Sequence, residues 1–146
     1  MGWYQEFIGD SDTPSKIYHL CPKEDWERRP VKFEYAPPSY QQEKLVRTTH
    51  EIGRLTETAN CFYKDKSPPT VEWVCLEIDT MGLRMNQIEM KMIESNMDPT
   101  LKCPHVYGKI PEEIIRNVYP VQRDLSSGEF LFVTGLTDAC QSHAKK

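Results

Sequence analysis

The sequence lacks the runs and motifs that mark several large classes of protein. Apolar stretches such as Phe130 to Val133 are far shorter than the roughly 20 residues that span a bilayer. Residues 1–10 have neither a basic start nor an apolar middle, so we expect no signal peptide. Glycine is scarce, with 7 in 146 residues, and there is no Gly-x-Gly-x-x-Gly, Walker or Gly-x-Ser-x-Gly motif. These absences argue against a membrane partner, a common phosphate loop and a nucleophile elbow.

A concentrated positive charge is also missing. The 18 Lys and Arg residues are outnumbered by 22 Asp and Glu and never form a run, and the net charge is -4. We therefore expect no nucleic-acid partner, because such proteins gather cations against phosphate. The 5 cysteines are scattered and include no Cys-x-x-Cys pair, so neither a zinc ribbon nor a thioredoxin-like motif is present. Reduced thiols and a cytoplasmic location are expected, and oligomeric state is not indicated.

What the sequence does contain fits one folded domain. Hydrophobic residues make up 38% and charged residues 27% of the chain, a balance typical of globular proteins. We expect an N-terminal arm over 1–15, a single domain over 16–134 and a mobile C-terminal tail over 135–146.

Short segments rich in β-forming residues dominate the domain. They predict strands over Lys16–Leu20, Val31–Tyr35, Val71–Ile78, Ile88–Met92 and Phe130–Val133. Residues 94–104 are expected to form a loop. Glu112–Val121 is ambiguous, because Pro111–Glu113 is typical of a helical first turn and Ile114–Val121 of a strand. Since strands and helices do not alternate, the pattern favours a mainly antiparallel α+β domain over a doubly wound parallel sheet.

The clearest helical pattern covers Thr49–Tyr63. Apolar residues recur there at helical spacing, and Thr48 with Glu51 has the form of a capping box. A shorter helix is expected over Pro22–Arg29, where proline suits the first turn.

Two sets of residues could bind an anion or line a pocket. Arg47, Thr48 and Thr49 stand at the expected start of the main helix, where free N–H groups and a guanidinium can hold an anion; capping alone is the alternative. His105 and Tyr107 precede Gly108, and such residues either line a pocket or pack the turn.

Histidine and cysteine offer two further candidates. His19 shares a face of the first strand with Ile17, so it is either a buried, hydrogen-bonded histidine or a ligand contact at a sheet edge. Cys103 and His105 are zinc-ligand types, but a second close pair is missing, and we predict no metal site.

Several segments, in this order, resemble the domain-of-unknown-function family 952. They are Ile17–Leu20 with Asp25–Glu27, Tyr35–Ser39, Thr58–Tyr63, Trp73–Asp79 and Pro104–Pro111. The resemblance implies an ADP-ribosyltransferase-like fold, with two small antiparallel sheets around a cleft, one main helix and one or two short helices. In active relatives of that superfamily the cleft holds NAD.

The resemblance also assigns residues to that cleft. His19 matches a first-strand histidine that holds ribose hydroxyls in active transferases, and His105 and Tyr107 fall on the Pro-His-x-Tyr-Gly motif. Arg47 replaces a histidine of the family; it cannot titrate near pH 7 but can pair with a phosphate. No carboxylate matches the glutamate of a transferase, and Glu129 is the nearest candidate.

The sequence thus leaves two functions open. One is a nucleotide-binding cleft, with NAD as the candidate cofactor and ADP-ribosyl transfer as the candidate activity. The alternative is a non-catalytic module that binds a protein or a small metabolite. The ligand-binding candidates are His19, Arg47, Thr49, His105 and Tyr107.

Overall fold

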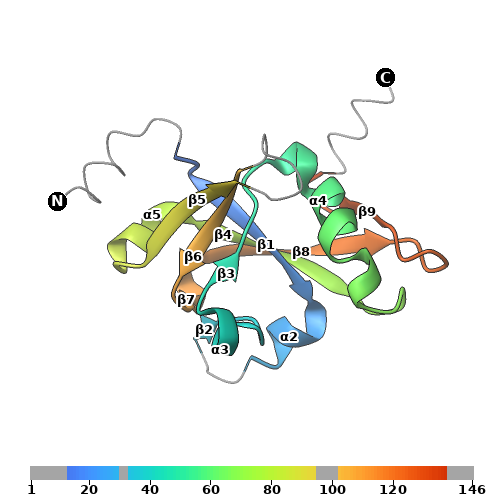
Figure 1. Cartoon of the computed structure of the whole chain (residues 1–146), viewed down its shortest axis with the longest axis horizontal. Coiled ribbons are helices and arrows are strands. Elements are labelled where there is room, and N and C mark those ends of the chain that lie inside the picture. The colour runs from blue at the N-terminus through green and yellow to red at the C-terminus, as the bar shows by residue number, and fades with distance from the viewer. Residues whose placement is uncertain (1–12, 30–32, 95–101, 138–146) are drawn as a thin grey trace.

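The computed structural model of the chain describes residues 13–29, 33–94 and 102–137 (Figure 1). The expectations for residues 1–12 of the arm and 138–146 of the tail lie outside these ranges. The described part is a mixed α+β fold with three sheets, of four, three and two strands, in which every strand pair is antiparallel.

The four-stranded sheet forms the centre of the molecule. Its order is β1 (Lys16–Pro22), β4 (Trp73–Asp79), β8 (Ile115–Arg123) and β9 (Phe130–Val133). Strand β4 is apolar almost throughout because it is buried on both faces. Its alternate side chains enter different parts of the core, as expected for a period of two.

Helix α4 (Leu55–Phe62) covers one face of this sheet, with Leu55 and Ala59 against Tyr18 and Trp73 (Figure 1). The opposite face packs against helix α5 (Thr80–Met85). No helix in the described ranges is both long and apolar enough to cross a bilayer.

The three-stranded sheet lies against the same opposite face. Its order is β3 (Val46–Arg47), β6 (Lys102–Tyr107) and β5 (Glu89–Glu94). Val46 and Val106 point into the core there, so their neighbours in sequence face outward.

The remaining elements are short. Strands β2 (Glu34–Tyr35) and β7 (Ile110–Pro111) form the two-stranded sheet. Helices α2 (Lys23–Glu27) and α3 (Tyr40–Glu43) flank it, as Figure 1 shows. Tyr35 of β2 is fully buried, and its ring centroid lies 6.0 Å from that of Trp26 in α2.

The α+β class and the mainly antiparallel pairing are confirmed, whereas the expectation of two sheets is wrong for the described residues, which form three. The expected main helix is also too long at its start: a 3-10 turn over Ile52–Arg54 precedes it, and the α-helix begins at Leu55. The capping box does not form, because the Thr48 hydroxyl donates instead to the Pro104 carbonyl at 2.7 Å.

Two of the described strands, β6 and β8, contain a proline away from their ends, and the expectation of a loop up to Pro104 is wrong for residues 102–104, which belong to β6. Pro104 lies in β6, the middle strand of its sheet, and its carbonyl accepts from Thr48, one residue beyond the end of β3. Pro120 of β8 likewise faces Thr134, one residue beyond β9. Each proline sits where the neighbouring strand has ended, so its missing N–H breaks no ladder bond there.

Candidate functional site

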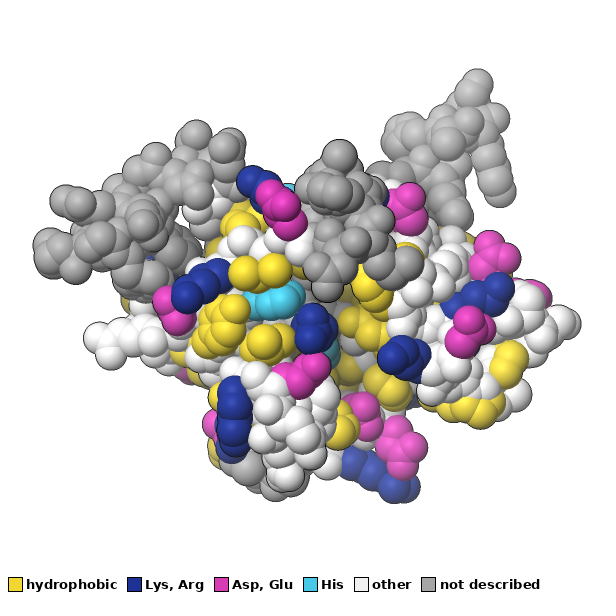
Figure 2. Space-filling view, viewed as in Figure 1, with side chains coloured by type: hydrophobic (Ala, Val, Ile, Leu, Met, Phe, Trp, Pro, Cys, Tyr) yellow, Lys and Arg dark blue, Asp and Glu magenta, His cyan; other side chains and the backbone are white. Residues whose placement is uncertain are grey.

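A cleft of about 410 Å³ opens where the four-stranded sheet, the three-stranded sheet and helix α4 meet. Strand β1 contributes Tyr18 and Leu20 as its floor. Its walls are Glu43, Arg47, Thr48, Thr49, Thr58, Phe62, Tyr63, Lys66, Ile93, Glu94, Cys103 and His105. Figure 2 shows histidine, basic and apolar side chains gathered on this face of the molecule.

The segment from Val46 to Thr49 builds the junction between the two sheets. Val46 and Arg47 pair with β6, and Thr49 exchanges two backbone hydrogen bonds with Tyr18 of β1, at 2.7 and 2.8 Å. Arg47 and Thr49 therefore line the cleft because the chain passes from one sheet to the other at this point, not because a helix begins there.

Arg47 brings a positive charge into the cleft beside His105. Arg47 and His105 are directly opposite each other in the β3–β6 pair, and both line the cleft. Burial, and then the charge of Arg47, lower the pKa of His105 from its ordinary value, so this imidazole is neutral at pH 7. The Arg47 Nη2 atom donates to Glu43 Oε2 at 3.0 Å.

Aromatic and apolar side chains form another wall. Phe62 and Tyr63 come from the end of α4, and Tyr63 is held by Trp73, with ring centroids 5.2 Å apart. With Tyr18 on the floor, they provide surfaces on which a flat ring can stack.

Thr58 is the unusual residue of the cleft. It is only 6% exposed, it lines the cleft, and its Oγ1 atom has no hydrogen-bond partner. Buried hydroxyl groups are normally paired, because an unpaired one costs stability. An unpaired, buried hydroxyl in a cleft wall is therefore suited to a ligand that completes it.

The thiol of Cys103 faces the cleft beside His105, since the two are spaced by two along β6. Burial raises its pKa, so the group is a neutral thiol near pH 7 and a poor nucleophile. No group of three or more His, Cys, Asp or Glu side chains arranged for a metal ion is found in the described ranges.

His19 does not line the cleft. It is 5% exposed, and its Nδ1 and Nε2 atoms lie 2.7 Å from the Arg47 carbonyl and 2.9 Å from the Tyr35 hydroxyl. A carbonyl can only accept, so Nδ1–H donates and Nε2 accepts from Tyr35. Both ring nitrogens are used within the fold, and His19 serves to position the backbone of Arg47.

The structure thus brings together Arg47, Thr49 and His105 and leaves out the other two candidates. Tyr107 does not line the cleft, and its ring centroid lies 5.6 Å from the Lys91 ammonium. Glu129 is exposed in the turn before β9 and lies outside the cleft as well.

Sequence reasoning missed Thr58, Tyr63, Lys66 and Glu43. Helical spacing offered a signal for one of them: Thr58 and Phe62 are four residues apart and share a face of α4. No sequence signal pointed to Glu43, because its place in the cleft depends on Lys44. This residue has a left-handed conformation, with φ of 59°, and turns the chain back.

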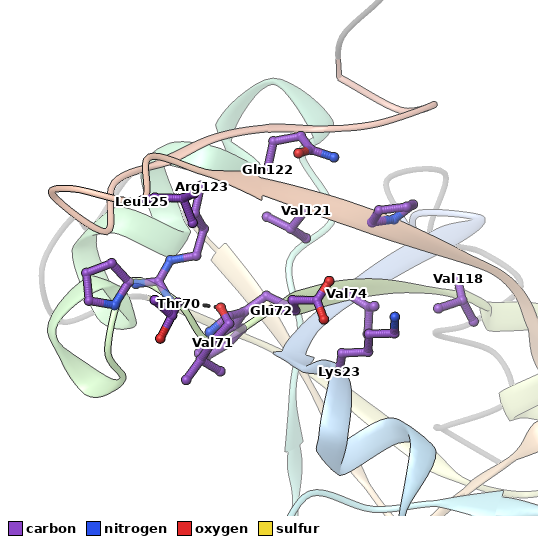
Figure 3. Close-up of a pocket in the computed structure, with 13 residues that line it drawn as sticks. Lys23, Thr70, Val71, Glu72, Val74, Val118, Val121, Gln122, Arg123 and Leu125 are labelled. Atoms are coloured by element: carbon purple, nitrogen blue, oxygen red, sulfur yellow. Dashed lines mark hydrogen bonds between the residues drawn. The ribbon is translucent and has the colours of Figure 1, made fainter.

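A second cavity, of about 460 Å³, lies at the end of the four-stranded sheet near the start of β4 and the end of β8 (Figure 3). Valine side chains line much of it, with Lys23 and Glu72 at its rim. Arg123 also lines this cavity, but its guanidinium already donates to the carbonyls of Pro68 at 2.9 Å and Val71 at 3.2 Å. Arg123 thus clamps the loop before β4 and is not free for a ligand.

Comparison with known proteins identifies the fold but no function. No family model and no curated protein matches the chain, so membership of family 952 stays a prediction. The crystal structure of protein CC0527 from Caulobacter crescentus is similar, with a TM-score of 0.61 and 14% identity over 80% of this chain and 93% of that one. Its solution NMR structure gives 0.59 and 14%, over 86% and 96%. A structure called EcPltA gives 0.51 and 11%, over 83% of each chain. The chain shares the fold of these proteins.

Proposed function

We propose that the protein binds a small nucleotide in the cleft, with NAD and ADP-ribose as the candidate ligands. The observation that carries this proposal is the unpaired hydroxyl of the buried residue Thr58, in the wall of a cleft that is also lined by Arg47 and by aromatic side chains. Arg47 supplies a forked donor for a pyrophosphate, and Tyr63 with Phe62 supplies a surface for a base. The volume of about 410 Å³ is within the usual range of small-molecule pockets.

Binding without catalysis is favoured over ADP-ribosyl transfer. His19, which the family resemblance assigns to the ribose, has both ring nitrogens engaged by Arg47 and Tyr35. Of the two carboxylates in the cleft wall, Glu43 is held by Arg47 and Glu94 is exposed at the end of β5. None of these groups is both buried and free to stabilise a sugar cation as nicotinamide leaves.

Thermal unfolding with NAD, ADP-ribose and adenosine tests the binding. A ligand at 100 times its dissociation constant adds about 2.7 kcal/mol of stability. We expect Arg47→Gln to reduce this gain for the two charged ligands. Lys109→Gln is the matched control: it also removes one cation from an exposed ion pair, with Glu34, but lies outside the cleft. No shift at millimolar ligand would remove the proposal for these compounds.

Thr58→Val separates binding from stability. The variant deletes the unpaired hydroxyl and keeps the shape, so it should fold with equal or greater stability. It should bind the nucleotide more weakly, since the ligand loses its buried partner. Unchanged affinity in Thr58→Val would contradict the role that we give to this residue.

Incubation with NAD tests the alternative activity. The binding proposal expects no release of nicotinamide above the rate in buffer. Release that depends on the protein and is lost in Arg47→Gln would overturn the non-catalytic assignment and favour transfer.

A further inference from the structure

The cleft holds a carboxylate beside Arg47. Glu43 ends helix α3, and Lys44 adopts a left-handed conformation that turns the chain back toward β3. Arg47 consequently returns to the same place, and its Nη2 atom donates to Glu43 Oε2 at 3.0 Å. Both side chains line the cleft, so the carboxylate of Glu43 occupies the donor that an incoming anion needs.

This ion pair is of a kind that a phosphate can displace. The side chains of Arg47 and Glu43 are 52% and 36% exposed, and pairs with such access to water contribute little because the solvent screens them. A pyrophosphate offers the guanidinium several oxygens in the geometry of two parallel hydrogen bonds, which is a stronger contact than one carboxylate oxygen gives.

Glu43 remains a full competitor at neutral pH. The hydrogen bond from Arg47 lowers the pKa of the Glu43 carboxyl below its ordinary value, so the group is ionised at pH 7. The neighbouring His105 is neutral under the same conditions, because burial and the charge of Arg47 lower its pKa. Arg47 is therefore the charged donor for which the carboxylate and a ligand compete.

We propose that Arg47 and His105 form an anion subsite for a pyrophosphate and that Glu43 is a built-in competitor for Arg47 within it. This inference rests on the proposed nucleotide binding. It predicts a selectivity: ligands with a pyrophosphate displace Glu43 and bind, whereas a neutral nucleoside gains nothing from the subsite. Glu43 thus weakens every ligand that must take Arg47 from it, so only an anion that contacts Arg47 more strongly than a carboxylate does gains from the subsite.

Calorimetric titration of ADP-ribose and of adenosine tests the inference. Glu43→Gln keeps the size of the side chain and removes its charge, and we expect it to tighten ADP-ribose binding roughly fivefold, the effect of deleting one partly screened negative charge near the phosphate. Adenosine affinity should not change. Glu89→Gln is the matched control, because Glu89 also belongs to an exposed ion pair, with Lys91, but does not line the cleft.

A double-mutant cycle distinguishes competition between Glu43 and the ligand for Arg47 from a general change in the electrostatic potential of the cleft. In the Arg47→Gln background, the effect of Glu43→Gln should shrink to that of the Glu89→Gln control. If Glu43→Gln and Glu89→Gln raise the affinity for ADP-ribose equally, or if Glu43→Gln does not raise it, Glu43 is not a competitor for Arg47. Nucleotide binding by the wild type would still stand in either case. If neither the wild type nor Glu43→Gln binds ADP-ribose, both the binding proposal and this inference fail for that ligand. Binding by Glu43→Gln alone would support competition for Arg47 but would overturn both nucleotide binding by the wild type and the displacement of Glu43 by ADP-ribose.

Discussion

Mild acid should destabilise this protein through a single buried imidazole. His19 is enclosed by the fold, and burial lowers its pKa from the ordinary 6.5 to about 4. The unfolded chain therefore takes up a proton below about pH 6.5 that the folded chain excludes until about pH 4. The contribution of neutral His19 to stability is fully present above the unfolded pKa and is lost as pH falls from there toward the folded one.

The size of the effect follows from those two values. At pH 5 nearly all unfolded molecules carry the proton on His19 and few folded molecules do, so linkage lowers the free energy of unfolding by about 2 kcal/mol relative to pH 7. The full loss, reached below pH 4, is about 3 kcal/mol. Domains of this size are stable by only about 5–15 kcal/mol, so the change is easily measured.

Urea unfolding between pH 8 and pH 5, followed by tryptophan fluorescence, is the assay. His19→Gln should be less stable at pH 7, and its stability should fall less between pH 7 and pH 5. His105→Gln is the control: the pKa of His105 is lowered in the same direction, but this ring is only half-buried, so its share of the slope should be smaller.

Two results would refute this reasoning. One is a wild type as stable at pH 5 as at pH 7, and the other is an unchanged slope in His19→Gln. If His19→Gln does not fold, NMR titration of the wild-type imidazoles decides the question, since the His19 resonance should not titrate above pH 5.

Three further substitutions test the packing. Gly82→Ala places a methyl group 2.7 Å from Ile114 Cβ, and calorimetric melting should show a loss of about 1–3 kcal/mol despite the gain in helix propensity. Asn60→Ala removes the amide that binds the Phe130 carbonyl at 3.0 Å and N–H at 2.7 Å; a loss of about 2 kcal/mol and faster exchange of the Phe130 amide are expected. In Arg123→Lys the ammonium group cannot span the several carbonyls that the guanidinium binds, so the free energy of unfolding in urea should fall by at least about 1 kcal/mol. An unchanged urea midpoint would contradict the clamping role of Arg123.

Patterns that depend on local composition predicted much of the fold. The run from Val71 to Ile78 predicts a strand buried on at least one face, and β4, which begins at Trp73, is buried on both; Phe130–Val133 is a strand as expected. Pro111–Glu113 predicted a helical first turn and Ile114–Val121 a strand, and the structure has a 3-10 turn over Glu112–Ile114 that leads directly into β8.

Features decided by distant partners could not be predicted in this way. Thr48 and Thr49 have the pattern of a helix start, yet Pro104 and Tyr18, far away in sequence, recruit them into sheet pairing instead. The cleft depends on the same pairing, so the sequence predicted a place for Arg47 in the cleft wall for the wrong structural reason. A local pattern cannot reveal which distant strand ends nearby.

Strand β9 is the open edge of the central sheet, yet it offers little for another chain to join. The backbone groups of Phe130 are held by Asn60, and the N–H and carbonyl of Val133 are held by Thr137. An exposed strand with unpaired backbone groups invites intermolecular pairing and aggregation. Here the Asn60 amide, the Thr137 hydroxyl and the Thr137 backbone N–H take the places of a foreign strand, so helix α4 and the turn after β9 protect the protein from polymerising through this strand.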